Sequence, residues 1–345
     1  MAATPGSKSL ARPPLRVIHV GVGGRGRWPL EVLGADPRFQ SVALVDVVPA
    51  HLEQARAITG LPSSACFASV DEALRAVEAD ALVICTPTVT HARFCRAGFG
   101  AGKHVLVEKG MTLDWQEANA LVQEAAQVGV CFCVSQNYRY TAEVQTLHHL
   151  LAGGEYGTAH LIDLIHHRYR PEPRTLNYPF AMVWDMSCHH FDNLVALFGP
   201  VARVTAVSHN APWSAYPYDA GLSAVLEFER GPVCTYQLTH QATVSDYRFV
   251  GQTERGGLRW QDGRWQFLPR PARQLGRNPE AIPLENVPVG RSEQGVVDDW
   301  YRYITEGVEP GISGRHNLET LAVCEMAVRS ATDRRPITRA MLAGS

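Results

Sequence analysis

The stretch Leu15-Arg-Val-Ile-His-Val20, followed at once by Gly21-Val-Gly-Gly-Arg-Gly26, decides the fold of this chain. The first six residues have the composition of a short buried strand, and the glycines follow the pattern GxGxxG before a helical stretch that runs to about Gly34. In this context Gly21 permits a tight turn, Gly23 lets the backbone approach a pyrophosphate, and Gly26 lets the helix pack on the strand. The stretch therefore predicts a strand–loop–helix unit whose helix N-terminus binds phosphate groups.

An acidic residue stands where such a unit needs one. Asp46 ends the next apolar segment, 20 residues after Gly26. A carboxylate there accepts hydrogen bonds from adenosine ribose hydroxyls and repels a 2′-phosphate, and Val47-Val48 offers no compensating base. The pattern predicts NAD as the cofactor, with NADP less favoured. The alternative is that Asp46 caps the following turn and the glycines only shape a loop.

Strands and helices alternate through the first half of the chain. Short loops between them indicate a parallel, doubly wound sheet. The expected strands are Leu15–Val20, Ser41–Asp46, Asp80–Cys85, His104–Glu108 and Val130–Val134, and the expected helices include Ala50–Thr59, Thr88–Ala101 and Asp114–Gln127.

The pattern changes after Gln136. A helix at Thr141–Ala152 and a long strand at Thr158–Tyr169 precede a helix from about Met186 to Phe198. Closely spaced extended segments then predict an antiparallel or mixed sheet, and helices close the chain. Those segments are Ala202–His209, Gly221–Glu229, Val233–Gln241 and Tyr247–Gly251, and the last helices are Glu293–Thr305 and Asn317–Ala331.

The fold class expected is therefore α/β, with a Rossmann domain at residues 1–136 and an α+β domain with a large, open, mostly antiparallel sheet at residues 137–345. Residues 1–14 read as a disordered tail. The helices within 293–331 are expected to pack back toward the first domain.

Composition narrows the class of protein. The chain has 345 residues, 46% of them hydrophobic and 19% charged, and its net charge is −2. The sequence has no stripe of basic residues of the kind that binds nucleic acid. It also has no apolar run that approaches the roughly 18 residues needed to span a membrane. Eight cysteines without a CxxC pair are typical of reduced thiols, so a cytoplasmic location and no metal site are expected.

Three further segments bear chemistry. Cys85-Thr-Pro-Thr-Val-Thr-His91 and Val107-Glu-Lys-Gly110 follow strands of the first domain, where doubly wound folds bind ligands. A helix is expected to begin in the segment Asp185-Met-Ser-Cys-His189-His-Phe-Asp192. Spacings of four and three residues would place Asp185, His189 and Asp192 on one face of this helix.

With these motifs in this order, the chain resembles the glucose–fructose oxidoreductase / inositol dehydrogenase (Gfo/Idh/MocA) family over nearly its whole length. The resemblance includes the stretch from Tyr138 to Gly157 and the C-terminal pattern that begins at Phe249. It implies an NAD-dependent dehydrogenase that moves hydride to or from a secondary alcohol carbon of a sugar, polyol, inositol or sugar acid.

The resemblance also implies catalytic roles for Lys109, Asp185 and His189. A histidine has an ordinary pKa of about 6.5 and suits proton transfer near neutral pH. The cofactor-binding residues expected are Gly21, Gly23, Gly24, Arg25, Gly26, Asp46, Thr86, Pro87, His91, Glu108 and Lys109, and the substrate-binding residues expected are Lys109, Asn137, Arg139, Trp184, Asp185 and His189.

Two departures from the family pattern bear on the site. Gly110 replaces the family's usual proline after the lysine, and Ser187 stands where a glycine is common. Four arginines could edge the pocket and bind a carboxylate or phosphate of the substrate, or form a solvated rim: Arg139, Arg168, Arg170 and Arg174.

Alternative functions remain open from sequence. One is an enzyme that keeps NAD tightly bound and recycles it during epimerisation, elimination or glycoside cleavage through a keto intermediate. Another is a non-catalytic NAD-binding sensor. The expected partner is a small carbohydrate or polyol. An exposed sheet face in the second domain predicts a homodimer or homotetramer.

Overall fold

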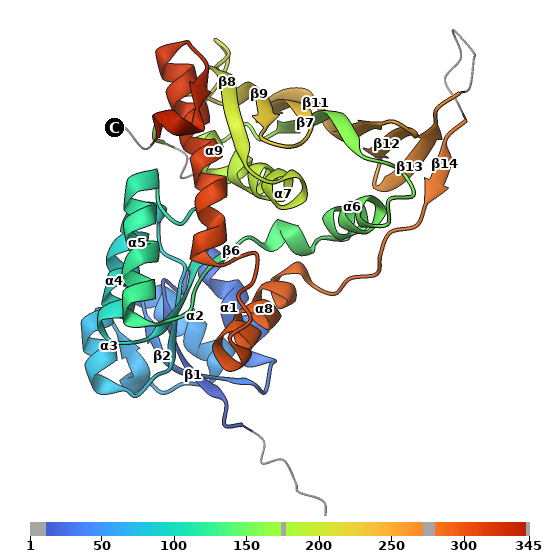
Figure 1. The fold of residues 1–345 in the computed structure, drawn as a ribbon. Coiled ribbons are helices and arrows are strands. Elements are labelled where there is room, and N and C mark those ends of the chain that lie inside the picture. The colour runs from blue at the N-terminus through green and yellow to red at the C-terminus, as the bar shows by residue number, and fades with distance from the viewer. Residues whose placement is uncertain (1–11, 174–176, 272–279, 343–345) are drawn as a thin grey trace, which may run out of the picture. The chain divides into compact units, whose positions relative to one another are not determined.

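The computed structural model describes residues 12–173, 177–271 and 280–342 (Figure 1). Most of the tail expected at residues 1–14, as well as Arg174, lies outside the described residues. By contact density the chain divides into two compact units. The first comprises residues 1–106 and 128–130, and the second comprises residues 107–127 and 131–345, so that Lys109 belongs to the second.

A six-stranded sheet in the order β3-β2-β1-β4-β5-β6 follows from the alternating pattern of the first part of the chain. Its recorded pairs β1–β2, β1–β4 and β2–β3 are parallel, which confirms the doubly wound fold. Its strands are β1 (Leu15–Val20), β2 (Phe39–Val45), β3 (Cys66–Phe67), β4 (Ala81–Ile84), β5 (His104–Glu108) and β6 (Phe132–Ser135). The short strand β3 was not predicted.

Five α-helices connect these strands. Val17 and Ile18 of β1 and Leu82 of β4 are fully buried, as expected for strands covered on both faces. The helices are α1 (Arg27–Gly34), α2 (Pro49–Thr59), α3 (Val70–Ala76), α4 (His91–Gly100) and α5 (Trp115–Val128).

The second unit contains a nine-stranded sheet in the order β14-β13-β12-β11-β7-β10-β9-β8-β15. The pair β10–β7 is parallel and its other recorded pairs are antiparallel, which confirms the predicted mixed sheet. The strands are β7 (Ala159–Tyr169), β8 (Val201–His209), β9 (Gly221–Phe228), β10 (Val233–Thr239), β11 (Gln241–Thr253), β12 (Gly256–Gln261), β13 (Arg264–Pro269), β14 (Ile282–Leu284) and β15 (Ile337–Thr338).

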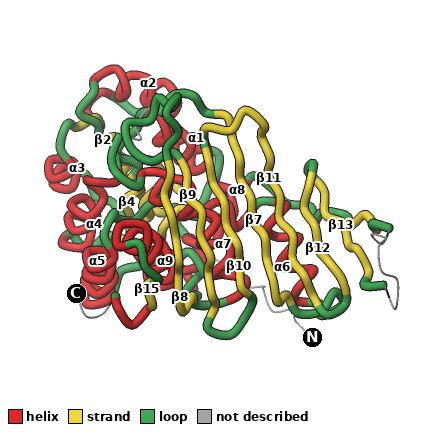
Figure 2. Tube along the Cα trace, turned by 90° about the horizontal axis from the view of Figure 1, so that it is seen from above, coloured by secondary structure: helices red, strands yellow, loops and turns green. Residues whose placement is uncertain are grey.

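One face of this sheet is buried and the other is exposed. On β7, Ile162 and Leu164 are buried, whereas Leu161 is 44% exposed and Tyr169 is 64% exposed. The strands lie side by side in Figure 2, with α7 behind them. The helices of this unit after α5 are α6 (Ala142–Ala152), α7 (Cys188–Phe198), α8 (Ser292–Glu306) and α9 (Gly314–Asp333).

The helix expected from Met186 begins differently from the prediction. A π-helical turn, Val183–Ser187, precedes α7, and Asp185 lies in that turn. A π turn closes wider hydrogen-bonded rings than an α-helix, so the α-helical spacing assumed between Asp185 and His189 does not apply. Among the described residues, no helix is long and apolar enough to cross a membrane.

Candidate functional site

The glycine loop in the first unit has a backbone that only glycine accommodates. Gly21 has φ of +78°, and a Cβ there would lie 2.8 Å from the carbonyl carbon of Cys85. A Cβ on Gly26 would collide with the carbonyl oxygen of Gly21. The loop is thus a cradle of bare backbone between β1 and α1, and it fits the pyrophosphate of a dinucleotide.

Asp46 lies beside this loop, as its position after β2 predicted. Its Oδ2 accepts hydrogen bonds from the backbone N–H groups of Val22 at 3.0 Å and Gly23 at 3.3 Å. Its Oδ1 accepts one from Val48 N at 2.9 Å. The carboxylate therefore also shapes the loop and caps the following turn, which is the alternative role that the sequence left open.

His51 is a neighbour of Asp46 that the sequence analysis missed. Its Nδ1 lies 3.2 Å from Asp46 Oδ2, and the imidazole covers the face of Gly23 that a side chain would otherwise fill. Its place in the first turn of α2, five residues after the acid, was the available signal. Asp46, His51 and the glycine loop form one polar cluster.

The segment after β4 is held by side-chain contacts. His91 is buried and its Nε2 lies 2.8 Å from the carbonyl oxygen of Thr86. The Thr90 hydroxyl donates to Thr86 Oγ1 at 2.8 Å. His91 thus shapes the Thr86-Pro87 turn from within the core, and its predicted direct contact with a cofactor stays a prediction.

In the second unit, Lys109 and Asp185 form a close ion pair. Lys109 Nζ donates to Asp185 Oδ1 at 2.8 Å and to the carbonyl oxygen of Asp185 at 2.7 Å. The side chains are only 14% and 28% exposed. The Lys109–Gly110 peptide bond is cis. Glu108, also buried, accepts from the backbone N–H of Lys109 at 3.0 Å.

Burial and charge act in opposite directions on this pair. Burial alone would lower the pKa of Lys109, but the Asp185 carboxylate, with Cys188 and Glu108, raises that pKa above its ordinary value. Burial would likewise raise the pKa of Asp185, but the charge of Lys109 keeps it below the ordinary value. Lys109 is therefore an ammonium at neutral pH, and it acts as a donor and not as a base.

His189 lies on α7 and is held from two sides. Its Nδ1 lies 3.1 Å from Oε1 of Gln136, and its ring stacks on Tyr138 with centroids 4.0 Å apart. An amide oxygen only accepts, so Nδ1 carries the hydrogen in this arrangement and the lone pair is on Nε2. Gln136 and Tyr138 lie next to the predicted Asn137 and Arg139, but sequence spacing gave no reason to select them.

A buried polar network supports the π turn. The Tyr236 hydroxyl donates to Ser187 Oγ at 2.9 Å, and it also lies 2.8 Å from Nδ1 of His190. His166 Nδ1 lies 3.2 Å from His190 Nε2. His190, next in sequence to His189, thus faces the sheet and not the Gln136 side, as expected for a structural histidine.

The predicted substrate residue Arg139 has another partner. Its NH2 donates to Asp192 Oδ1 at 2.9 Å, and Thr320 donates to the same oxygen at 2.8 Å. The assumption that Arg139 faces substrate is not supported by this pairing, because the guanidinium already neutralises the buried Asp192. Asn137 Nδ2 donates to Ser292 Oγ at 3.3 Å, and the Trp184 side chain is buried.

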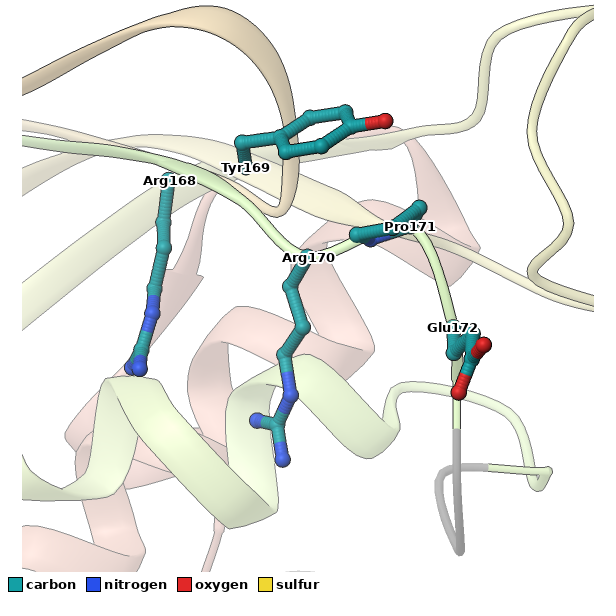
Figure 3. Close-up of a pocket in the computed structure, with 5 residues that line it drawn as sticks. All are labelled: Arg168, Tyr169, Arg170, Pro171 and Glu172. Atoms are coloured by element: carbon teal, nitrogen blue, oxygen red, sulfur yellow. The ribbon is translucent and has the colours of Figure 1, made fainter.

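A hollow of about 360 Å³ opens at the C-terminal end of β7, next to Asp185. It is lined by Arg168, Tyr169, Arg170, Pro171 and Glu172 (Figure 3). One guanidinium nitrogen of Arg170 lies 3.9 Å from Asp185 Oδ2, which links the hollow to the Lys109–Asp185 pair. Among the described residues, no cluster of histidine, cysteine and acidic side chains is arranged to hold a metal ion.

Comparison with known families gives two matches along the chain. Residues 15–136 match the family model of an oxidoreductase family with an NAD-binding Rossmann fold (GFO_IDH_MocA). Residues 144–259 match the model of the GFO/IDH/MocA C-terminal domain.

Individual relatives have low sequence identity to this chain, but they align with most of its length. The chain is 25% identical to an inositol 2-dehydrogenase of Rhizobium meliloti, over 92% of this chain and 97% of the relative. It is 24% identical to a scyllo-inositol 2-dehydrogenase (NADP⁺) of Bacillus subtilis, over 74% and 78%. An oxidoreductase from Agrobacterium radiobacter, solved with NAD⁺, L-tartaric acid and magnesium, superposes with a TM-score of 0.83 over 95% of this chain and 99% of that one, at 16% identity. At that identity the superposition shows the shared fold.

Proposed function

The chain belongs to the Gfo/Idh/MocA family of oxidoreductases, and from that premise we propose that it is a dehydrogenase that transfers hydride between NAD and a secondary alcohol carbon of a sugar, polyol, inositol or sugar acid. The observation that carries the proposal is the largely buried ion pair between Lys109 and Asp185, of which Asp185 stands four residues before His189 in the sequence. These residues supply a cationic donor, an anion that holds it and an imidazole.

The residues that would hold the dinucleotide are those of the glycine loop, Asp46 and the Thr86-Pro87 turn. When bound, the nicotinamide accepts or returns the hydride. The carboxylate of Asp46, beside the loop, favours ribose hydroxyls over a 2′-phosphate, which supports NAD. A Bacillus subtilis relative is named for NADP⁺, so the preference is a point to test.

In the proposed mechanism, Lys109 Nζ donates a hydrogen bond to the reacting oxygen and stabilises its alkoxide-like form. The Nε2 lone pair of His189 takes the hydroxyl proton, and Gln136 fixes the tautomer by accepting from Nδ1. The stacked ring of Tyr138 fixes the plane of the imidazole. Asp185 holds the ammonium in place through both its carboxylate and its carbonyl oxygen.

The first test is absorbance at 340 nm with NAD⁺ or NADP⁺ and a panel of inositols, sugars and sugar acids. Formation of NADH with one substrate class supports the proposal. No reduced cofactor, but NAD released when the purified protein is denatured, would replace it with internal recycling of bound NAD. Binding of NAD without any turnover would indicate a sensor, and no binding would remove the cofactor assignment.

His189→Ala separates binding from chemistry. The substitution should abolish turnover, because it removes the proton acceptor, while NAD affinity stays within about twofold of the parent. Replacement of His148, a histidine on α6 outside the proposed site, is the matched control. Turnover that survived in His189→Ala would contradict the assignment of the base.

The exposed face of the nine-stranded sheet supports an oligomer, which we propose to be a homodimer or homotetramer. Several apolar side chains on this face are open in the single chain, which is unusual for a face that stays in water. They are Leu161 at 44%, Val207 at 63%, Val225 at 37% and Val233 at 39% exposure. Light scattering at micromolar concentration tests it, and a monomer would contradict it.

The cysteines fit the proposed cytoplasmic location. No disulfide joins any of the eight, all of which lie within the described ranges. Reduced thiols are typical of proteins in a reducing compartment.

A further inference from the structure

Two arginines at the end of β7 point to the same side. On this strand Ile162 and Leu164 are buried on one face of the sheet, and His166 contacts His190 of α7. Arg168, at the end of the strand, is exposed. Figure 3 shows the guanidinium groups of Arg168 and Arg170 directed to one side of the strand end, with the Tyr169 ring directed away from them.

The guanidinium groups of Arg168 and Arg170 form no close ion pair with a carboxylate among the described residues. Among the ion pairs found within residues 12–173, 177–271 and 280–342, none involves Arg168, and its side chain is exposed. Arg170 approaches Asp185 at 3.9 Å, the outer limit of an ion pair. Asp185 is already bound by Lys109 at 2.8 Å, so positive charge exceeds negative charge around the hollow.

The strand end itself is rigidly fixed. The backbone N–H of Arg170 donates to the carbonyl oxygen of His240 at 2.8 Å, and the Tyr216 hydroxyl donates to the carbonyl oxygen of Arg170 at 2.9 Å. Tyr216 and His240 are both buried. Arg170 therefore projects from a backbone that is held on two sides, which suits a residue that orients a ligand.

His240 adds a buried acceptor to the same cluster. Its Nδ1 lies 3.3 Å from the Tyr216 hydroxyl, whose hydrogen goes to Arg170, so Nδ1 carries a hydrogen and Nε2 a lone pair. Within the described residues, this Nε2 is buried without a hydrogen-bond partner. Burial, followed by Arg170, His166 and Arg168, lowers the pKa of His240 to about 4, so the ring is neutral at pH 7. The neutral ring belongs to the packed support of the strand end and is not among the residues that line the hollow.

We propose that Arg168 and Arg170 bind the carboxylate of a sugar acid, and that this enzyme oxidises or reduces a polyhydroxylated carboxylate of monosaccharide size. The inference rests on the proposed dehydrogenase function and names its substrate class. The planar guanidinium fork matches a carboxylate. The hollow of about 360 Å³ is at the small end of ligand pockets, and this size is sufficient for one sugar ring.

The excess of positive charge around the hollow favours an anionic sugar over a neutral one. Binding of a sugar acid is therefore expected to be tighter than binding of the neutral sugar of the same size, and a sugar phosphate is included in the test as the competing anion.

The experiment compares matched ligands with the parent chain, Arg168→Gln and Arg264→Gln. The acidic ligands are glucuronate and gluconate, and they are compared with glucose, glucose 6-phosphate and several neutral polyols. Binding is measured by isothermal titration calorimetry, and turnover is measured by NADH formation. Arg264 is an exposed arginine on β13 and controls for the loss of one positive charge. We expect Arg168→Gln to weaken binding of the acids about 10- to 100-fold, mainly through Kd and KM, and to affect neutral polyols far less than the acids. Arg264→Gln should behave as the parent does.

Outcomes for this inference and for the proposed function differ. If neutral polyols are turned over as well as the acids and Arg168→Gln changes neither, the sugar-acid inference is overturned and the dehydrogenase stands. If the phosphate ester binds more tightly than the acids, the carboxylate assignment is overturned. If no ligand is turned over and NAD does not bind, the proposed function itself fails, while calorimetry still reports whether the arginines bind an acid.

Discussion

The ammonium of Lys109 lies 2.8 Å from Oδ1 of Asp185 and 2.7 Å from the carbonyl oxygen of the same residue. Two contacts to one residue of a π turn fix the position of the charge more firmly than a single ion pair would. Because Asp185 also keeps the pKa of Lys109 raised against the effect of burial, the lysine stays protonated over the range in which a histidine base titrates. In the proposed mechanism the lysine donates to the reacting oxygen and His189 accepts the proton.

Replacing Lys109 by Ala should lower kcat by about 100- to 10,000-fold, since the donor to the reacting oxygen is lost. NAD affinity, measured by fluorescence titration, should change little. Lys109→Arg keeps the charge but not the compact donor geometry, and should recover less than a tenth of the activity. A Lys109→Ala variant with more than half the parent kcat would contradict the assigned role.

Asp46→Asn tests the cofactor preference without collapsing the loop. The amide oxygen can still accept from the backbone N–H of Val22, but the negative charge is removed. We expect the ratio of kcat/KM for NADP⁺ to that for NAD⁺ to rise at least tenfold. Glu53→Gln, an exposed carboxylate on α2, should leave the ratio unchanged. An unaltered ratio in Asp46→Asn would mean that Asp46 only shapes the loop.

Much of the fold could be read from the sequence because its signals are local. The strand Leu15–Val20 has the predicted bounds, and Gly21 and Gly26 occupy positions where a side chain would collide. The strands β12 to β15 were missed. The last two, β14 and β15, have only three and two residues, and β15 pairs with the distant strand β8. The strands β12 and β13 form a local hairpin that the sequence analysis overlooked. The π turn was also missed, since Asp185 and His189 have the spacing of an α-helix and tertiary contacts decide otherwise.

The candidate site was likewise predictable where its residues lie in local motifs, and not where they come from distant segments. The family resemblance, carried by the order of the motifs, predicted catalytic roles for Lys109, Asp185 and His189, and Lys109 and Asp185 are in contact. Gln136, which fixes the tautomer of His189, and Tyr236, which holds Ser187, come from distant segments with no motif of their own. Arg139 was assigned to substrate, although its charge is taken up by Asp192, because the sequence does not show which face of α7 the segment Asn137–Tyr140 meets.

Tyr236→Phe should loosen the π turn. The substitution removes the hydrogen bond to Ser187 Oγ and the contact with His190, and leaves both groups buried with one partner fewer. The free energy of unfolding should fall by about 1–3 kcal/mol, and kcat should fall several-fold with NAD affinity unchanged.

The double variant Tyr236→Phe/Ser187→Ala removes both ends of the Tyr236–Ser187 hydrogen bond. In urea titrations it should lose less stability than the sum of the two single substitutions. Strictly additive losses would show that this hydrogen bond does not stabilise the turn.

Glu143→Gln should stabilise the protein relative to the parent, and this stabilisation should be larger at neutral pH than at acid pH. Burial raises the pKa of Glu143 to about 7, against the hydrogen bond from the Tyr247 hydroxyl at 2.5 Å, which lowers it. The folded chain therefore binds this proton more tightly than the unfolded chain. That contribution to stability is complete below pH 4.5 and is lost as the pH rises to about 7. Glutamine keeps an acceptor for Tyr247 and never ionises.

Urea unfolding at pH 5, 6, 7 and 8 measures this difference directly. The free energy of unfolding of Glu143→Gln minus that of the parent should increase between pH 5 and 7 by up to roughly 3 kcal/mol and then level off. Other titrating groups are common to both proteins and cancel in the difference. Glu53→Gln, which removes a carboxylate that is 69% exposed, is measured in parallel as the control for the loss of one negative charge. A flat difference for Glu143→Gln would mean that Glu143 is already ionised in the folded protein at pH 5, and that the hydrogen bond from Tyr247 outweighs the cost of burial.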